Sequence, residues 1–349
     1  MQILFLTDPV PDYLADLLYS GLVRVLGQES VVDFPLKPAY HDPEHRVHYI
    51  PQVRAHAFQE DDICGLLQAK RFDFVICSSP RPGALKSWKA LRNRVLLPPV
   101  IFLDGEDDAS IRVDVWKGID AVLYFKRELL AGRRHASCTE HQSRLYPLQL
   151  SVSSDHLGPD VSRTRDVDVS YVARVSHPKR KRAVELLATV PGLRFEGGVY
   201  AESTDRQSKV LVGLPRLWAK LRGDPPVTPE QRGVKLSHEA YSDLLTRSKM
   251  GLSVRGGGFD TLRYWEVPAT RTVLLSERPD IEIPNNFVHG EQALFFNPDL
   301  SDLVELVQAY VKEEAVCAAI AERGYEHTMR YHTCERRAEQ FLAICKQSI

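Results

Sequence analysis

Short, uninterrupted apolar runs that alternate with helical patterns restrict this chain to few folds. Strands with one face in water alternate apolar and polar residues, whereas these runs are apolar at almost every position, as in a parallel sheet covered on both faces. In the first half of the chain the runs lie at 2–7, 31–34, 72–79, 98–108, which ends in the acidic turn DGEDD, and 121–125. Helical patterns separate them, with one helix opened by Pro11 and another at about 61–70. This alternation predicts a doubly wound α/β domain.

The same rhythm restarts after the polar stretch 150–166, whose Ser, Asp, Gly and Pro content is typical of a linker. Residues 201–236 are polar and irregular, as expected of an inserted loop. Strands are predicted at 167–173, 194–200, 250–254 and 272–277. Helices are predicted at 178–190, at 237–248 with a Ser237 cap, from Asp260 onward, and after a Ser301 cap. A last helix places one apolar stripe on its surface, made of Cys334, Ala338, Phe341, Leu342 and Cys345.

Two similar α/β halves follow from this pattern. We expect an N-terminal domain at 1–155, a second domain at 166–333 and a final helix at 334–349. A length of 349 residues agrees with a prior of about two domains.

Composition indicates a globular chain with no strong preference for charged partners. Hydrophobic residues make up 44% and charged residues 26%, and 45 Lys plus Arg balance 46 Asp plus Glu. No global field therefore attracts nucleic acid or an anionic membrane. We find no secretory signal and no apolar run of the roughly 20 residues that a transmembrane helix needs. The six cysteines have neither disulfide-motif nor zinc spacing, so we expect free thiols in a reducing cytoplasm.

The stretch SVRGGGFDTLRYWEVP, residues 253–268, carries the strongest functional signal. It follows a predicted strand, and ligands of open α/β sheets bind beyond the carboxyl ends of strands. Glycine lets the backbone approach a ligand, and the following helix N-terminus offers unpaired N–H groups. Arginine has a fork geometry suited to phosphate, and Glu266, one turn after Arg263, can accept both hydroxyls of a ribose. The predicted nucleotide-binding residues here are Arg255, Gly256, Gly257, Gly258, Thr261, Arg263 and Glu266.

Other interpretations of this stretch stay open at this point. The glycines can form a flexible turn without a ligand, and Arg263 and Glu266 can form an exposed ion pair on a helix surface. The first strand of the chain is followed by TDPVPDY and not by G-x-G-x-x-G, which argues against a standard dinucleotide site.

Residues 248–311 and 325–342 resemble the C-terminal half of glycosyltransferases with two Rossmann-like domains, the GT-B fold. The similarity is to the family 1 and 4 type, including spore-coat maturation glycosyltransferases, and more distantly to the exostosin domain. These families share the pattern R-x-x-E-x-x-A-x-G. Here RYWEVPATR matches it at Arg263, Glu266 and Ala269, and Arg271 stands in place of the glycine. Residues 167–182 resemble the family to a smaller extent.

The resemblance implies two Rossmann-like domains that face each other across a cleft, with a final helix that crosses back to the first domain. It implies a nucleoside-diphosphate sugar as donor, with Glu266 on the ribose. Cations after the first strand of the second domain would hold the diphosphate, and here they are Arg174, Lys179 and Arg180. For Lys179 and Arg180 the alternative is a solvated basic helix start.

Acidic residues follow the strands of the N-terminal half, where an acceptor would bind. Asp8, Asp104 and Glu106, together with Asp107, are therefore candidates for the base that takes the acceptor proton. The alternative is that they cap the following helices, above all Asp107 and Asp108.

We expect no metal and no separate cofactor. The DGEDD stretch lacks calcium-loop spacing, and the histidines of 41–56 lack the H-E-x-x-H zinc pattern. In the families that the chain resembles, arginines and a helix N-terminus usually replace a metal. The segment 41–56 is instead a candidate loop over the acceptor site.

The sequence therefore predicts a cytoplasmic, metal-independent glycosyltransferase that uses a nucleotide-sugar donor. The acceptor hydroxyl can belong to a glycan, a protein, a small molecule or a nucleic acid. A sugar-nucleotide 2-epimerase and a catalytically inactive nucleotide-binding relative are alternatives on the same fold. A nucleic-acid-modifying enzyme is a further alternative, but the basic stretches PKRKR and GRRH lack interleaved aromatic residues.

Overall fold

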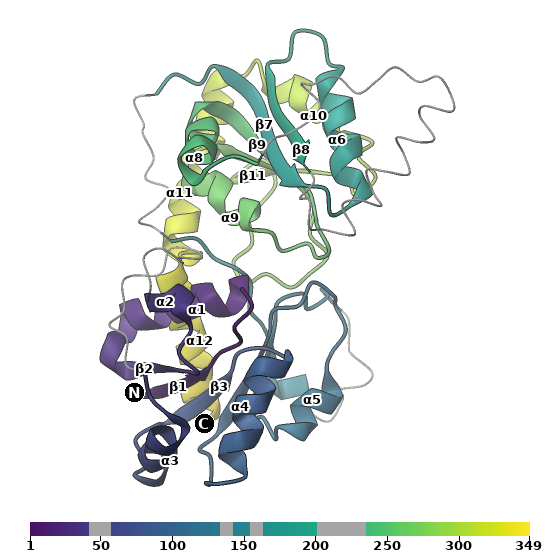
Figure 1. Ribbon diagram of the computed structural model, residues 1–349. Helices are drawn as coiled ribbons and strands as arrows, with labels where there is room; N and C mark the ends of the chain where they lie inside the picture. The colour runs from purple at the N-terminus through teal and green to yellow at the C-terminus, as the bar shows by residue number, and fades with distance from the viewer. Residues whose placement is uncertain (42–56, 133–141, 154–162, 201–234) are drawn as a thin grey trace. The chain divides into compact units, whose positions relative to one another are not determined.

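The computed structural model divides into two compact units (Figure 1). Unit 1 comprises Met1–His156, Asp280–Asn285 and Arg330–Ile349, and unit 2 comprises Leu157–Pro279 and Asn286–Met329. The structure describes residues 1–41, 57–132, 142–153, 163–200 and 235–349.

Unit 1 is built on a six-stranded parallel sheet in the order β2-β1-β3-β4-β5-β6. The strands are β1 (Ile3–Leu6), β2 (Val31–Phe34), β3 (Phe74–Cys77), β4 (Val100–Asp104), β5 (Leu123–Lys126) and β6 (Leu145–Pro147). The first five lie in the five apolar runs, which confirms that prediction. The edge strand β6 was not predicted, because three residues carry too short a pattern to recognise.

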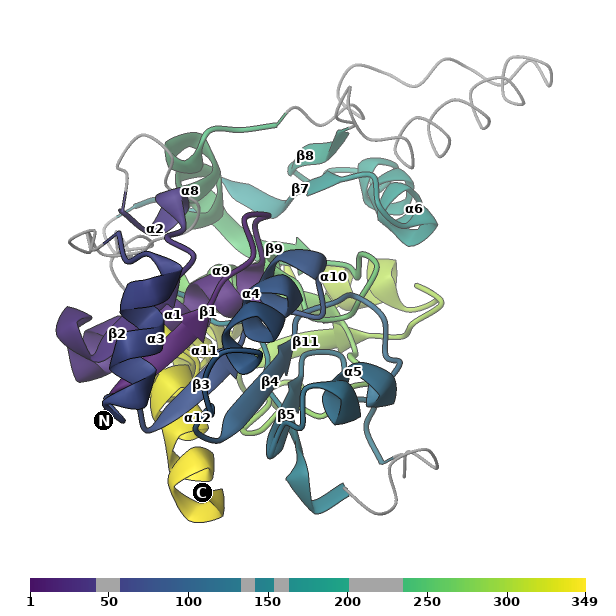
Figure 2. The same ribbon diagram turned by 60° about the horizontal axis from the view of Figure 1, so that its bottom comes forward.

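Helices cover both faces of this sheet, as Figures 1 and 2 show. Successive strand residues point to opposite faces, and Val75 packs with α3 and α4 in one apolar core while Phe74 lies against α12 on the other side. This double cover is why the strands are apolar throughout. The helices of unit 1 are α1 (Tyr13–Leu26), α2 (Pro38–His41), α3 (Glu60–Gln68), α4 (Pro82–Arg92), α5 (Val113–Gly118) and α12 (Cys334–Ser348).

The C-terminal helix α12 packs against α1 within unit 1, seen as the yellow helix beside the purple one in Figure 1. The whole predicted stripe of α12 is buried. The ring of Phe341 lies 4.7 Å from that of Phe125 and 6.4 Å from that of Phe74. The two helix backbones approach closely at Gly21, where a Cβ atom would lie 2.0 Å from the carbonyl oxygen of Cys334. Only glycine permits this contact.

Unit 2 contains a five-stranded parallel sheet in the order β11-β10-β9-β7-β8. Its strands are β7 (Val167–Arg174), β8 (Phe195–Tyr200), β9 (Ser248–Ser253), β10 (Val273–Glu277) and β11 (Ala293–Phe296). One face packs against α6, α10 and α11, and the other contacts α8 and α9. These helices are α6 (Pro178–Ala188), α8 (His238–Arg247), α9 (Leu262–Ala269), α10 (Leu303–Tyr310) and α11 (Glu314–Tyr331).

The predicted helix starts are partly confirmed. The Ser237 side chain caps α8 by accepting a hydrogen bond from the backbone N–H of Ala240. Helix α1 begins at Tyr13 with Asp12 as its cap, so Pro11 lies outside the helix. Helix α10 has Asp302 at its cap position in place of Ser301, whose N–H donates to Asp299. Residues 201–234 of the predicted loop 201–236, and the histidine segment after His41, lie outside the described residues.

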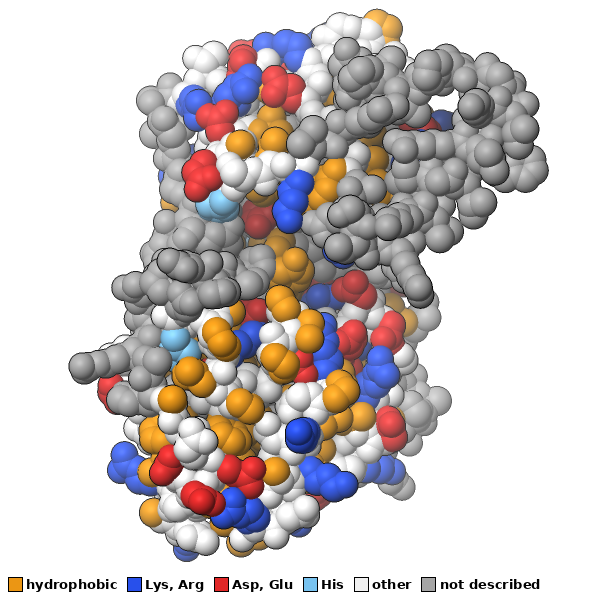
Figure 3. Space-filling model, in the orientation of Figure 1, with side chains coloured by type: hydrophobic (Ala, Val, Ile, Leu, Met, Phe, Trp, Pro, Cys, Tyr) orange, Lys and Arg blue, Asp and Glu red, His pale blue; other side chains and the backbone are white. Residues whose placement is uncertain are grey.

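The five described cysteines are free and buried, in agreement with the expected thiols. Figure 3 shows acidic and basic side chains interspersed on the face that it draws, in keeping with the net charge of −1. In the described part of the chain, every helix is too short or too polar to cross a membrane.

Candidate functional site

The predicted nucleotide residues of unit 2 gather at the carboxyl edge of its sheet. Strands β7, β9 and β10 are neighbours, so the segments that follow them meet at one edge. Arg174 ends β7, the turn Arg255–Gly258 follows β9, and Glu277 ends β10. Helix α9 begins at Leu262, with Phe259, Asp260 and Thr261 between it and the glycine turn, and carries both Arg263 and Glu266.

Glu266 is buried, with only 7% of its surface exposed. The hydroxyl of Tyr241 on α8 donates a hydrogen bond to its Oε2 at 3.1 Å. Its Oε1 receives no hydrogen bond from the described part of the chain. Burial raises the pKa of the Glu266 carboxyl, while the nearby Arg263 charge and the Tyr241 hydrogen bond oppose that rise. A buried carboxylate with one open oxygen suits a ligand that donates hydrogen bonds.

Arg263 lies one helical turn before Glu266, but the two do not form an ion pair in the described structure. The guanidinium lies 5.7 Å from the ring centre of Tyr171, and its Nε is buried without a hydrogen-bond partner. The alternative of an exposed Arg263–Glu266 pair is therefore wrong. Both charges are instead held inside the site, where an unpaired cation favours an anionic ligand.

Arg180 braces the two loops of this edge. Its Nη1 donates to the carbonyl of Arg174 at 2.8 Å, and its Nε donates to the carbonyl of Arg255 at 3.0 Å. A Cβ atom on Gly256 would lie 2.9 Å from Arg180 Nη2, so glycine lets the turn close against this arginine. Arg180 is buried, which excludes the alternative of a solvated helix start and favours a positioning role over direct contact with phosphate.

Lys179 is half-buried and forms an ion pair with Glu277, whose other oxygen, Oε2, is buried without a partner. The side chain of His177 caps α6, and its pKa is lowered by burial and by the Arg255 charge. Arg174 is exposed at the end of β7. The end of β7 thus supplies one exposed cation, and the start of α6 supplies one that an acidic residue already holds.

The glycine turn is compact. The N–H of Gly256 donates to the carbonyl of Gly258 at 2.9 Å, and Arg255 Nη2 donates to the carbonyl of Gly257 at 3.0 Å. Thr261 occupies the cap position of α9 without capping it, since its hydroxyl lies 3.1 Å from that of Ser253. The first N–H groups of α9 therefore receive no cap from the Thr261 side chain.

Arg271 replaces the glycine of the family pattern, and the structure explains how. Its φ is +53°, the left-handed conformation in which glycine is usually found. The side chain stacks 3.7 Å from the ring centre of Tyr325 and pairs with Glu322 at 2.8 Å. These contacts hold an arginine in a backbone conformation that a glycine would adopt without support, so the turn after α9 is retained.

The predicted catalytic residues of unit 1 are largely occupied by structural contacts. Asp104 is 0% exposed and accepts hydrogen bonds from the Tyr124 hydroxyl at 2.5 Å and from the N–H of Glu106 at 3.1 Å. The Lys126 ammonium lies 3.0 Å from its Oδ2. Burial, and then the contact with Asp104, raise the pKa of Tyr124 well above its usual value. This arrangement favours a structural role for Asp104.

Asp8 is buried and accepts hydrogen bonds from the N–H groups of Val10 and Gly83, next to the start of α4. Glu106 stays partly exposed and pairs with Arg81 at 2.9 Å.

Asp107 pairs with Arg127, and Asp108 accepts from the N–H of Ser110. Helix α5 begins later, with Arg112 at its cap position, so the capping alternative is wrong for Asp107 and Asp108.

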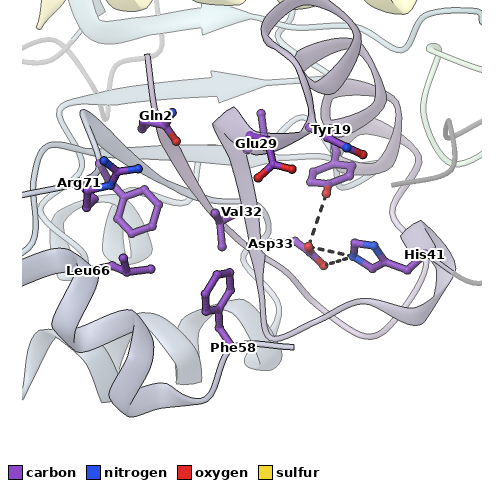
Figure 4. Close-up of a pocket in the computed structure, with 12 residues that line it drawn as sticks. Gln2, Tyr19, Glu29, Val32, Asp33, His41, Phe58, Leu66 and Arg71 are labelled. Carbon is purple, nitrogen blue, oxygen red and sulfur yellow. Dashed lines mark hydrogen bonds and ion pairs between the residues drawn. The ribbon is translucent and has the colours of Figure 1, made fainter. Parts of the chain in front are cut away.

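A cavity of about 170 Å³ lies along the edge strand β2 of unit 1 (Figure 4). Its most polar feature is Asp33, which pairs with His41 at 2.9 Å and also accepts from Lys37 N–H and the Tyr19 hydroxyl. Because several donors already satisfy the Asp33 carboxylate, we assign the Asp33–His41 pair a structural role and not a role in substrate binding.

The sequence analysis did not identify several residues at the carboxyl edges of the two sheets. Tyr241 lies on a helix distant in sequence from Glu266, so no local spacing indicates their contact. Tyr171 occupies an ordinary strand position. Glu277 could have been identified from the sequence, because it is the polar residue that ends a predicted apolar strand. Asp12 follows the first strand in the same way; burial raises its pKa, and its Oδ2 is buried without a hydrogen-bond partner.

Comparison with known proteins agrees with this arrangement. Residues 180–343 match a family described as glycosyl transferase-like. HepE of Anabaena, solved in complex with UDP-glucose, is 12% identical, with a TM-score of 0.66 over 99% of this chain and 100% of its own. A glycosyltransferase of Rickettsia africae is 10% identical, with a TM-score of 0.67 over 99% and 98% of the two chains. Sucrose-phosphate synthase of Thermosynechococcus elongatus is 12% identical, with a TM-score of 0.60 over 99% of each.

No curated protein sequence matches the chain significantly. At such low identities the solved structures establish the fold, which consists of two Rossmann-like domains. The family match adds sugar transfer as the general class of reaction that the comparisons support. With its two parallel sheets and the matched C-terminal region, the chain resembles the GT-B glycosyltransferases.

Proposed function

We propose that this protein transfers a sugar from a nucleoside-diphosphate sugar to an acceptor hydroxyl, without a divalent metal. One observation carries the proposal: Arg263, with no carboxylate partner, lies one turn from Glu266, which keeps one oxygen open. A ligand that satisfies both must offer an anion and at least one hydrogen-bond donor to the open oxygen, and a ribose diol can direct two donors to it. A nucleoside diphosphate has both groups, and HepE of Anabaena was solved with UDP-glucose.

In this mechanism the cations of unit 2 stabilise the leaving diphosphate. Negative charge grows on that group as the bond to the sugar breaks, and preorganised cations lower the barrier because they need no rearrangement. Arg263 and Arg174 supply this charge, with Arg255 at the glycine turn. Arg180 holds the turn and the end of β7 in register. Glu266 fixes the ribose and thereby the position of the reacting carbon.

The acceptor proton requires a base if the reaction inverts the sugar configuration. Among Asp8, Asp104 and Glu106, only Glu106 has a partly exposed carboxylate, with 29% of its side chain accessible. We therefore assign the proton-accepting role to Glu106, with Arg81 as the group that orients it. Asp8 and Asp104 support the loops around it.

The test is a thermal-shift panel of UDP, GDP, ADP and CDP and their sugars, since a ligand that binds the native state raises the melting temperature. Wild-type protein is compared with Glu266→Ala and with Glu305→Ala, a matched control on the exposed surface of α10. We expect at least one nucleotide to stabilise wild type and the control but not Glu266→Ala. Equal shifts in all three proteins would refute the ribose assignment.

Product analysis separates transfer from the alternatives. A transferase incubated with donor and an acceptor library yields free nucleoside diphosphate and a glycosylated product. A 2-epimerase converts the donor with no acceptor present, and an inactive relative binds nucleotide without turnover. Either of these outcomes would replace the transferase proposal.

A further inference from the structure

The contact between Tyr241 and Glu266 joins two elements that are distant in sequence. Tyr241 lies in the first turn of α8, and its hydroxyl donates to Glu266 Oε2 at 3.1 Å. Helix α8 is anchored at its start by the Ser237 cap and by the burial of Leu244 and Leu245 further along. The tyrosine therefore approaches Glu266 from a fixed helix and not from a loose loop.

The groups around Glu266 give the Tyr241 hydroxyl a specific role. The charged and titratable groups that face the carboxylate are Arg263 on its own helix α9, and Tyr241 and His238 on α8. Arg263 attracts the carboxylate from a distance but makes no ion pair with it. Among the described residues, the Tyr241 hydroxyl makes the hydrogen bond that sets which oxygen of Glu266 is occupied.

We propose that Tyr241 is a positioning residue that engages Oε2 of Glu266 and so presents Oε1 to the ribose diol of the nucleotide. This inference rests on the proposed function of Glu266. By holding the carboxylate in one rotamer, Tyr241 makes the site selective for a ligand with both ribose hydroxyls. A 2′-deoxyribose offers only one donor, so it gains less from a fixed carboxylate.

A consequence follows for pH dependence. Glu266 accepts hydrogen bonds from the diol in its ionised form, so affinity falls as pH drops through the pKa of this carboxyl. The Tyr241 hydrogen bond favours the ionised form and opposes the effect of burial. Removing the hydroxyl therefore raises the pKa, and the acid limb of the binding curve moves to higher pH. The Arg263 charge remains in place and limits the size of this shift.

The experiment compares Tyr241→Phe with wild type in the full-length chain. Binding is measured by calorimetry for UDP, GDP and ADP and for the 2′-deoxy form of each, and the pair whose ribose form binds wild type most tightly is followed from pH 5 to pH 8. Tyr310→Phe serves as the control, because Tyr310 is a partly buried tyrosine on α10 in the same unit. Melting temperatures verify that each variant is folded.

We expect wild type to prefer the ribose form, and Tyr241→Phe to lower that preference about three- to tenfold, within the range for the net contribution of one ordinary hydrogen bond. Its acid limb should move to higher pH, and the control should behave as wild type. If Tyr241→Phe weakens both sugar forms equally and the acid limb stays in place, Tyr241 is only structural and the inference fails.

Glu266→Gln separates that failure from failure of the proposed function. If Tyr241→Phe has no selective effect but Glu266→Gln abolishes the ribose preference, Glu266 binds the ribose without help from Tyr241. If Glu266→Gln keeps the preference and the affinity of wild type, the ribose assignment itself is wrong, and the role of Tyr241 falls with it.

Discussion

The carboxyl edges of the two sheets use acidic residues in opposite ways. In unit 1, Asp104 is enclosed by Tyr124, Lys126 and a backbone N–H. In unit 2, Glu266 is also buried, yet it has one hydrogen bond from Tyr241 and an open oxygen. Asp104 ends β4 and Glu266 lies in α9, the helix that follows β9, so a strand end carries a satisfied carboxylate and the helix after a strand carries an incompletely satisfied one.

This difference distinguishes a carboxylate that supports the fold from a carboxylate that is available to a ligand. A buried charge that the protein satisfies completely stabilises its surroundings, and its loss lowers stability. A buried charge that the protein leaves incompletely satisfied costs free energy in the empty site and is stabilised by a ligand. Mutations at the edge of unit 1 should therefore change the free energy of unfolding, whereas mutations at the edge of unit 2 should change ligand affinity.

The largest effect is expected from deletion of α12, which tests unit 1 as a structural body. Truncation after Thr333 removes the buried stripe of the helix, and each large apolar side chain contributes about 1.5–3 kcal/mol. For Phe341 and Leu342 the sum is about 3–6 kcal/mol. The smaller buried residues Cys334, Ala338 and Cys345 add to it, so the loss reaches the lower part of the stability of a typical domain, about 5–15 kcal/mol. We expect no folded protein by circular dichroism, whereas truncation after Cys345, which removes only exposed residues, should leave the melting temperature unchanged. An unchanged melting temperature after the longer truncation would show that α12 is dispensable.

Lys126→Met should destabilise unit 1 by about 3–5 kcal/mol, because it leaves the Asp104 carboxylate buried without its cation. Urea unfolding measures the change, and Lys117→Met, at an exposed position of α5, is the matched control. Nucleotide affinity at pH 7 should stay at the wild-type value. Weaker nucleotide binding in a folded Lys126→Met protein would contradict the division between a supporting and a recognising edge.

Glu266→Ala should weaken nucleotide binding by about 1.5–3 kcal/mol through loss of a charged hydrogen bond. Its melting temperature without ligand should not fall. Burial raises the pKa of Glu266 in the folded state, so its contribution to stability is present at low pH and lost as pH rises through that pKa. At neutral pH the ionised carboxylate thus does not stabilise the empty site. Calorimetry and thermal unfolding together test this, and a variant that unfolds easily but binds normally would reverse the interpretation.

The smallest effect is expected from removal of divalent metal. In the proposed mechanism the cations of unit 2, among them Arg263 and Arg174, supply positive charge to the leaving diphosphate, so donor turnover in excess EDTA should equal turnover without it. A loss of turnover that magnesium or manganese restores would show that protein cations alone are insufficient. Arg263→Lys in the same assay tests whether fork geometry matters beyond charge.

Much of the fold was predictable because parallel strands buried on both faces must be apolar throughout. The runs around Leu4, Val75 and Leu252 became strands, and the stripe of α12 proved to be buried. Local boundaries were less predictable, because several neighbouring polar residues can each cap a helix. The helix expected to open at Pro11 begins at Tyr13 with Asp12 at its cap position. The cap expected at Ser301 is at Asp302.

The site was predictable only where its residues are close in sequence. Arg263 and Glu266 stand one helical turn apart after a glycine turn, so spacing alone placed them on one side of a helix. The partners that decide their chemistry come from elsewhere: Tyr241 from α8 and Tyr171 from β7. The roles of Arg180 as a brace and Asp104 as a support likewise depend on such distant contacts.

By itself, the sequence determined the order of strands and helices and the two-part organisation, and it nominated the residues proposed to bind phosphate and ribose, because these follow from periodicity and residue chemistry along the chain. The tertiary structure decided which charges are satisfied. Asp104 at the end of β4 and Glu266 in α9 are both buried acidic residues, and only the groups packed around them decide how completely each carboxylate is satisfied. Burial and hydrogen-bond partners are set by segments far apart in sequence, which no local pattern encodes.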